Sequence, residues 1–334
     1  MSHAIRMAAC AAAATLAAAA AGAQTPPLLD QASIWTISGE NDSISTTPGG
    51  SDKYYTSGLR LGWTSGANQA PDLVSEYATG FWGSGITRAS FEVTQQIFTP
   101  SNIIRTRPQP NDRPVVAYLA ATFGVLHDTP NRRDIAALSL GVIGPWALGR
   151  QVQNGFHELI HERINQGWGN QGSNEPAVEV LASRTWRRAI GSLGGMEADV
   201  LPAATIGIGT VRDYAQAGAT LRFGQHLDAD FGVARIRPGV SGGDAFSATD
   251  HVPWYVFAGV NGQVVARDAF LNGNIFSRSP GVQHNWLLGE MQAGIAIIWH
   301  GTRISYTQTW QTASFKGQKG GLFNFGSLTA SFKL

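Results

Sequence analysis

One segment of the chain matches the H-E-x-x-H pattern of zinc proteases, namely His157-Glu158-x-x-His161. Two histidines one helical turn apart can bind one Zn²⁺ ion, and the glutamate between them can activate a water molecule. No H-x-x-G-x-x-H continuation follows, so Glu175 or Glu179 would have to supply the third ligand. The pattern therefore offers a secreted zinc metalloprotease as one candidate function. The alternative is a solvent-exposed loop helix in which the histidine pair is a coincidence.

The histidine pair lies in a segment with helical periodicity. Between residues 151 and 164, apolar residues recur at helical spacing at Val152, Phe156, Leu159 and Ile160. This spacing predicts a short amphipathic helix in a loop of a chain whose other segments read as strands.

A second polar cluster surrounds two predicted strands near the N-terminus. Asn41 and Asp42 follow the alternating segment 34–38, and Thr56 lies near the start of the next one. If the two strands are neighbours in a hairpin, these three side chains converge, and their oxygens could bind a hard cation or position a base. Thr56 shares a face with Arg60, so we expect it to point to the polar side. The alternative is that Asn and Asp serve turn geometry here.

Alternation with a period of two residues recurs along the whole chain. Apolar and polar faces that alternate over segments of ~10 residues are what a closed barrel in lipid requires, because an unpaired strand edge cannot face hydrocarbon. The pattern predicts an all-β fold, a transmembrane antiparallel β-barrel of about twelve strands. The last strand shows it most clearly, since one face carries Leu328, Ala330, Phe332 and Leu334 and the other carries Thr329, Ser331 and Lys333.

A soluble β-sandwich or a lipocalin-like barrel would also alternate. However, the outward faces here are apolar where a soluble sheet would show charge. Tryptophans also lie near the ends of predicted strands, as in the aromatic girdles of membrane barrels. These are Trp63, Trp254, Trp299 and Trp310.

Composition and targeting agree with an outer-membrane location. Charged residues make up 14% of the chain, against roughly 25% in typical proteins. Residues 1–6 are basic, residues 7–21 are Ala-rich, and small residues follow at 21–23, which predicts a signal peptide over 1–23 and a single barrel domain over 24–334. Cys10, the one cysteine, would leave with the signal. The net charge of +1 gives no indication of nucleic-acid binding.

Several motifs in combination resemble the outer-membrane lipid A 3′-O-deacylases. The resemblance implies a twelve-stranded barrel that removes the acyloxyacyl group at the 3′ position of lipid A with the help of Ca²⁺. It also implies a site between the barrel wall and a loop helix near the outer leaflet. The motifs are END at 40–42, DKYYTSGLRLGW at 52–63, QQIFTPSN at 95–102, GVIGPWALGRQVQNGFHELI at 141–160 and NEP at 174–176.

The family's catalytic residues carry over by motif. Its Asn-Asp pair falls on Asn41 and Asp42, its strand threonine on Thr56, and its histidine on His157, the one in Q-N-x-x-H. Its acidic residue in the loop helix falls on an arginine, Arg163. Glu162 is the adjacent acid and is retained as a candidate, although neighbouring side chains on a helix diverge by ~100°.

The resemblance implies that His157 acts as general base on water and that Ca²⁺, with Asp42 as the best candidate ligand, stabilises the oxyanion. Asn41 and Thr56 would position the metal, the base or the ester. Arg60 is expected to pair with a wall carboxylate in the lumen, the alternative being a lipid A phosphate. We expect a monomeric integral protein of the bacterial outer membrane whose partner is lipid A. A catalytically inactive or porin-like barrel is the alternative function.

Overall fold

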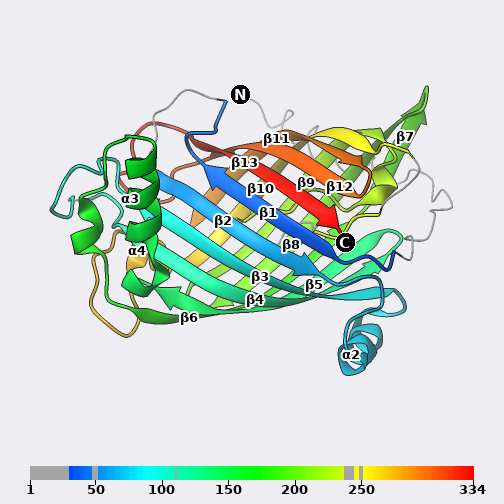
Figure 1. Ribbon diagram of the computed structural model, residues 1–334, viewed down its shortest axis with the longest axis horizontal. Helices are drawn as coiled ribbons and strands as arrows, with labels where there is room; N and C mark the ends of the chain where they lie inside the picture. The colour runs from blue at the N-terminus through cyan, green and yellow to red at the C-terminus, as the bar shows by residue number, and fades with distance from the viewer. Residues whose placement is uncertain (1–29, 47–51, 110, 237–243, 248–250) are drawn as a thin grey trace, which may run out of the picture.

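The computed structural model describes residues 30–46, 52–109, 111–236, 244–247 and 251–334 (Figure 1). The predicted signal peptide, residues 1–23, lies outside the described residues. The strands are β1 (Ile34–Asn41), β2 (Tyr54–Thr64), β3 (Ile86–Thr99), β4 (Val116–Thr129), β5 (Arg132–Ile143), β6 (Glu175–Trp186), β7 (Arg188–Leu193), β8 (Met196–Gly209), β9 (Arg212–Gln225), β10 (Trp254–Asp268), β11 (Leu287–Trp299), β12 (Thr302–Gln311) and β13 (Phe323–Lys333). The helices are α2 (Asp72–Trp82), η2 (Pro145–Ala147), α3 (Gly149–Leu159), η3 (Gly167–Asn170), η4 (Leu227–Ala229) and α4 (Ala269–Asn272).

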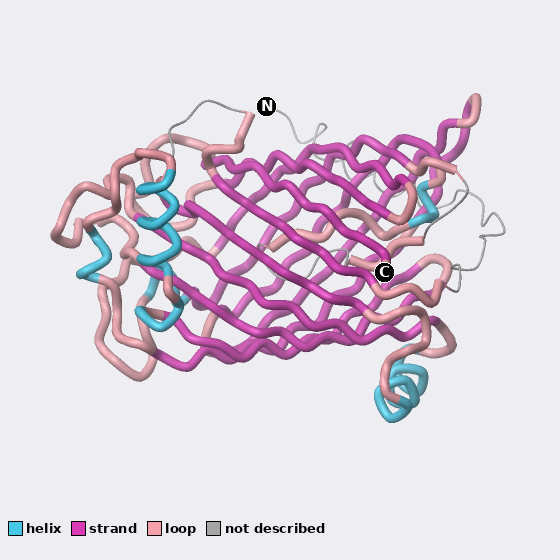
Figure 2. The backbone as a smooth tube through the Cα atoms, viewed as in Figure 1, coloured by secondary structure: helices cyan, strands magenta, loops and turns pink. Residues whose placement is uncertain are grey.

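The strands close into a barrel. Each strand from β1 to β6 and from β8 to β13 pairs with its neighbours in sequence, β1 pairs with β13, and β6 pairs with β8. Twelve strands of the described chain therefore form the ring, and β7 continues β6 as an exposed hairpin arm with the start of β8. Figure 2 shows that strands make up nearly all of the wall. The predicted closed antiparallel barrel of about twelve strands is confirmed.

The wall has an apolar outer face and a polar inner face. On β1, Ile37 is 59% exposed, whereas its neighbours Thr36 and Ser38 are buried. Leu61, which pairs with Ile37, is 49% exposed. Apolar surface exposed around a whole wall would be costly in water and is what a lipid-facing belt needs. One aromatic row of this outer face crosses five adjacent strands through paired residues: Phe332, Trp35, Trp63, Phe91 and Phe123.

The two ends of the barrel differ. At one end, here called the turn end, two-residue turns at 130–131 and 300–301 join strands, and β13 finishes. The other end, here called the loop end, carries long connections at 100–115, 144–174, 269–286 and 312–322, whereas the turn end carries two, at 65–85 and 226–253. Barrels of the outer membrane place short turns in the periplasm and long loops outside the cell. No helix in the described part of the chain is long and apolar enough to cross a membrane.

Ion pairs fill the lumen at the turn end, where the connection between β9 and β10 enters the barrel. Asp230 of this connection accepts hydrogen bonds from Arg222 (2.6 Å) and Arg303 (3.2 Å), and all three side chains are fully buried. The phenol of Tyr255 donates a further hydrogen bond to Asp230 (2.8 Å). Charges removed from water in this way must be paired within the protein to be tolerated.

A second lumen pair confirms the expectation for Arg60. Its guanidinium lies 3.0 Å from Glu92 of the wall and 2.9 Å from Asp244 of the β9–β10 connection. The lipid A phosphate alternative for Arg60 is therefore not favoured, since both carboxylates lie inside the barrel.

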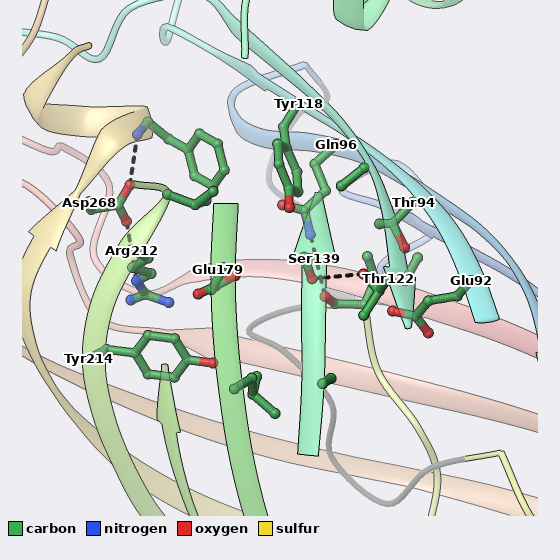
Figure 3. A pocket seen from close by; sticks show the side chains of 16 residues that line it. Glu92, Thr94, Gln96, Tyr118, Thr122, Ser139, Glu179, Arg212, Tyr214 and Asp268 are labelled. Atoms are coloured by element: carbon green, nitrogen blue, oxygen red, sulfur yellow. Dashed lines mark hydrogen bonds and ion pairs between the residues drawn. The ribbon is translucent and has the colours of Figure 1, made fainter. Parts of the chain in front are cut away.

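Aromatic side chains fill the lumen at the loop end. Phe98 stacks on Phe270, which follows β10, with ring centroids 4.4 Å apart. Tyr55 packs edge-on against Phe325 at 5.1 Å. Between the two fillings lies a small polar cavity lined by Glu179 and other wall residues (Figure 3). The described residues therefore leave no wide channel, and this argues against a porin-like function.

The buried ion pairs predict how the barrel responds to a single change. Asp230→Ala removes one carboxylate partner from each of two buried guanidinium groups, those of Arg222 and Arg303. This should lower the free energy of unfolding by about 3–5 kcal/mol. The barrel should then convert from its compact to its unfolded gel mobility at a lower temperature than the parent protein. Asp228→Ala is the control, because Asp228 lies in the same connection but is exposed. Equal conversion temperatures for all three proteins would contradict the assignment.

Candidate active site

Helix α3 stands against the outer face of the wall at the loop end (Figure 1). Because Phe98 points into the lumen, its neighbour Ile97 on β3 points outward. Ile97 packs in one apolar cluster with Ala117, Trp168 and Val152 of α3. The predicted helix over 151–164 is confirmed in place but not in length. It begins at Gly149 and ends at Leu159.

Gly149 sets how closely α3 approaches the wall. A Cβ at this position would lie 2.4 Å from the Cβ of Ala117 and 2.5 Å from the ring of Trp168. Any larger residue would therefore push the first turn of α3 away from β4. The close packing places the buried face of the helix, with Gln153 and His157, against the end of the barrel wall.

Both ring nitrogens of His157 lie close to oxygen atoms. Its Nδ1 lies 2.6 Å from the backbone carbonyl of Arg163. A carbonyl can only accept, so Nδ1 carries the proton and Nε2 is left as the basic nitrogen. Nε2 lies 3.3 Å from Oδ1 of Asp52. The imidazole is therefore oriented in the form that a general base requires, with a carboxylate beside its free nitrogen.

Gln153 connects Asp52 to the loop that follows α3. Its side-chain amide donates to Oδ1 of Asp52 (3.2 Å). Its carbonyl oxygen accepts from Nδ2 of Asn165 (2.9 Å) and from the indole of Trp168 (3.1 Å). Gln153 is buried, and these three hydrogen bonds all go to groups of the site, so its side chain positions them.

Asp42 lies directly after β1 and is buried. Its Oδ2 accepts the backbone N–H of Lys53 (3.0 Å), whereas its Oδ1 has no hydrogen-bond partner among the described residues. Burial raises the pKa of Asp42 to about 7, although the backbone N–H groups of Lys53 and Asp52 oppose this effect. A buried carboxylate oxygen without a donor is a fitting ligand for a hard cation. The described residues contain no group of three or more His, Cys, Asp or Glu that could hold a metal ion, so a cation here would also need amide, hydroxyl or backbone oxygens or water as ligands.

The structure places Asn41 and Glu40 differently from Asp42. Asn41 Oδ1 accepts the backbone N–H of Ser43 (2.7 Å), which is the turn role that the sequence left open. Glu40 points into the lumen, where it accepts from the phenol of Tyr55 (2.7 Å) and the hydroxyl of Ser327 (2.9 Å). The polar cluster seen in the sequence is thus divided between the two sides of the wall.

The prediction that Thr56 shares the polar inner face with Arg60 is wrong. A β-bulge between Tyr55 and Ser57 removes Thr56 from the ladder with β3 and from the alternation. Its hydroxyl lies 2.7 Å from that of Thr99, which follows the inward Phe98. Because Thr99 donates to the carbonyl of Asp52 (2.8 Å), Thr56 must donate to Thr99. Thr56 therefore lies on the side of α3 and supports the backbone of Asp52.

The zinc site of the H-E-x-x-H pattern is not formed. Helix α3 ends before His161, which is exposed and has a positive φ of 59°. The two proposed third ligands are engaged elsewhere. Glu175 accepts the backbone N–H groups of Ile275 (2.7 Å) and Phe276 (2.9 Å), and Glu179 lines the lumen cavity.

In the described part of the chain, the side chain of Glu162 makes no hydrogen bond to His157, Asp52 or Gln153. Its backbone N–H donates to the carbonyl of His157 (2.8 Å), but its side chain is exposed. The segment 52–53 links the two sides of the site: Asp52 lies beside the ring of His157, and the backbone N–H of Lys53 donates to Asp42. The structure adds Gln153 and Thr99, which the sequence did not single out, and it places Asp52, one of the oxygen-rich residues of the N-terminal polar cluster, beside His157. Asp52 lies in the motif that begins at 52, and this was the available signal.

The role of Gln153 leads to a testable expectation. Gln153→Ala removes the acceptor of two buried donors, each worth about 1–3 kcal/mol when left unpaired. The loop after α3 should open more often, and trypsin should cleave the folded barrel faster after the exposed Arg163. Gln151→Ala provides a matched control, since Gln151 is exposed on the same helix. If both variants are cleaved at the parent rate, Gln153 does not hold this loop.

Comparison with known proteins agrees with the fold and the location. A sequence model of a family described as outer membrane protein LpxR matches residues 7–334. The structure of LpxR from Salmonella typhimurium aligns with a TM-score of 0.75 and 22% identity, covering 90% of this chain and 100% of that one. The β domain of the Bordetella autotransporter BrkA aligns with a TM-score of 0.44 and 10% identity, covering 90% and 97%. No curated protein matches the sequence.

Proposed function

This chain belongs to the outer membrane protein LpxR family, and from that premise we propose that it hydrolyses the 3′-linked acyloxyacyl ester of lipid A in the outer leaflet. The reaction class is carboxylic ester hydrolysis. The motifs at 40–42, 52–63 and 141–160 support the proposal, because they resemble the lipid A 3′-O-deacylases. The position of the site also supports it, since a membrane lipid can reach the outer face of the wall.

The geometry of His157 is the observation that carries the proposal. Its Nδ1–H is held by the carbonyl of Arg163 at 2.6 Å, so its Nε2 is free to take a proton from water. The water then attacks the ester carbonyl, and His157 returns the proton to the leaving alkoxide. Asp52, 3.3 Å from Nε2, stabilises the imidazolium formed between these steps.

The same geometry accounts for the departure at Arg163. In this chain a backbone carbonyl orients the catalytic ring, and it does so whatever side chain residue 163 carries. An acidic side chain at position 163 is therefore not needed to hold Nδ1 of His157. Glu162 remains a candidate from the resemblance, with its side chain exposed.

Asp42 is the residue that would hold Ca²⁺, through its unpaired and buried Oδ1. When bound there, the ion would supply Lewis-acid stabilisation of negative charge on the ester oxygen. Thr56 and Thr99 fix the backbone of Asp52, whose N–H also serves Asp42. Asn41 holds the turn that follows β1.

The decisive test is mass spectrometry of lipid A from membranes that contain the protein. The parent protein should remove the 3′ acyloxyacyl group, and chelation of divalent cations should stop the reaction. His157→Ala should lower the rate roughly 10²–10⁴-fold, as expected for loss of a general base. His161→Ala, with the histidine that the zinc hypothesis requires, should act at the parent rate.

Unchanged lipid A in every sample that contains folded barrel would refute the enzyme and leave an inactive barrel. Loss of activity in His161→Ala equal to that in His157→Ala would instead restore the histidine pair as the functional unit.

The role of the Arg163 carbonyl gives a separate expectation. Arg163→Ala changes the side chain and keeps the carbonyl that accepts from His157, so kcat should stay within a factor of about two to three, the range of ordinary surface substitutions. Deacylation rates measured on the same lipid A vesicles would check this. A loss comparable to that of His157→Ala would show that the side chain, and not the backbone, acts in the reaction.

A further inference from the structure

Helix α2 stands against the outer face of the wall at the turn end. It connects β2 to β3, and Figure 1 shows it outside the barrel with its axis running across the barrel's length. The ring of Trp82, at its end, lies 5.7 Å from that of His127 on β4. His127 and Phe123 lie four residues apart on the same strand, so both point outward. Nδ1 of His127 forms a hydrogen bond with the hydroxyl of Thr87 on β3 (3.0 Å). The helix therefore covers part of the surface that elsewhere faces lipid.

Three apolar side chains of α2 have no cover within the described protein. Leu73, Tyr77 and Phe81 recur every four residues on one face, and they are 64%, 71% and 82% exposed. A different face carries Ala78, which is buried, and Trp82, whose ring lies beside His127 of the wall. Large apolar residues gathered on one face of a helix indicate a surface that another apolar medium covers.

The position of this face identifies the covering medium. The outer wall between α2 and the middle of the barrel carries Trp63 and Phe91, which belong to the aromatic row described above. Rows of this kind mark the boundary between hydrocarbon and lipid headgroups. A helix that packs on the same outer face, beyond that row and toward the periplasm, meets the headgroup region of the inner leaflet.

We propose that α2 is an interfacial helix whose Leu73, Tyr77 and Phe81 insert into the headgroup region of phospholipid in the periplasmic leaflet of the outer membrane. The helix contains no lysine or arginine and has Asp72 and Glu76 on its remaining face. Insertion therefore depends on apolar area and not on attraction to anionic lipid. The inference is independent of the proposed hydrolysis.

Single spin labels can test this, because Cys10 is the chain's one cysteine. The full chain with Cys10→Ser would carry Tyr77→Cys or Leu73→Cys on the apolar face. Thr79→Cys, which is exposed on the opposite side of the same helix, is the matched control. Each labelled barrel would be reconstituted in vesicles of phosphatidylethanolamine and phosphatidylglycerol, and heat-modifiable gel mobility would verify folding.

Collision of the labels with apolar oxygen and with a water-soluble nickel chelate reports their surroundings. Labels at 77 and 73 should favour oxygen over nickel several-fold more than the label at 79, at both low and high salt. Equal preference for nickel at all three positions would overturn the proposal. Spin–spin broadening that grows with protein density would also overturn it, since a second copy would then cover the face. If the oxygen preference were lost at high salt, insertion would depend on electrostatic attraction, and the proposal that apolar side chains drive it would be refuted.

Discussion

Every backbone N–H and C=O group at membrane depth must find its partner within the protein, because hydrocarbon offers none. In this chain the requirement is met by closure, through the pairing of β1 with β13 and of β6 with β8. Closure forces each strand to present one face to lipid and one to the lumen. The remaining features follow from it, since an apolar exterior, a polar interior and a site outside the wall all presuppose a complete ring.

A closed polar lumen requires that its buried charges be paired within the protein. Arginines of the wall lie in the lumen, where Glu92 and Asp199 of the wall pair with some of them and the β9–β10 connection brings in Asp230 and Asp244 as further partners. At the other end aromatic rings fill much of the lumen. The described side chains fill the lumen from both ends, and the candidate site lies on the outer surface of the wall.

The site depends on local departures from the regular wall. The bulge at Thr56 turns its hydroxyl toward α3, and Gly149 lets α3 lie close to β4. Together they set Asp52 beside His157, while the loop after the helix returns a carbonyl to Nδ1. A backbone group is an orienting partner that substitution of a side chain does not remove. The contact to Nδ1 therefore does not depend on the side chain at position 163.

The alternation of side chains was legible in the sequence because it is a local property that repeats every two residues, and it predicted the strands, the closed barrel and its membrane location. The helical spacing of apolar residues predicted which loop carries the helix, and the motifs led to the hypothesis that His157 is the functional histidine. The sequence alone placed Thr56 on the wrong face and extended the helix to include His161, because a bulge and a helix end each depend on neighbours from other strands. Asp52 and His157 are separated by about a hundred residues of chain, and no local pattern relates them. Only the closed barrel decided that they meet, since it fixes where the ends of β2 and β3 stand and hence where α3 packs.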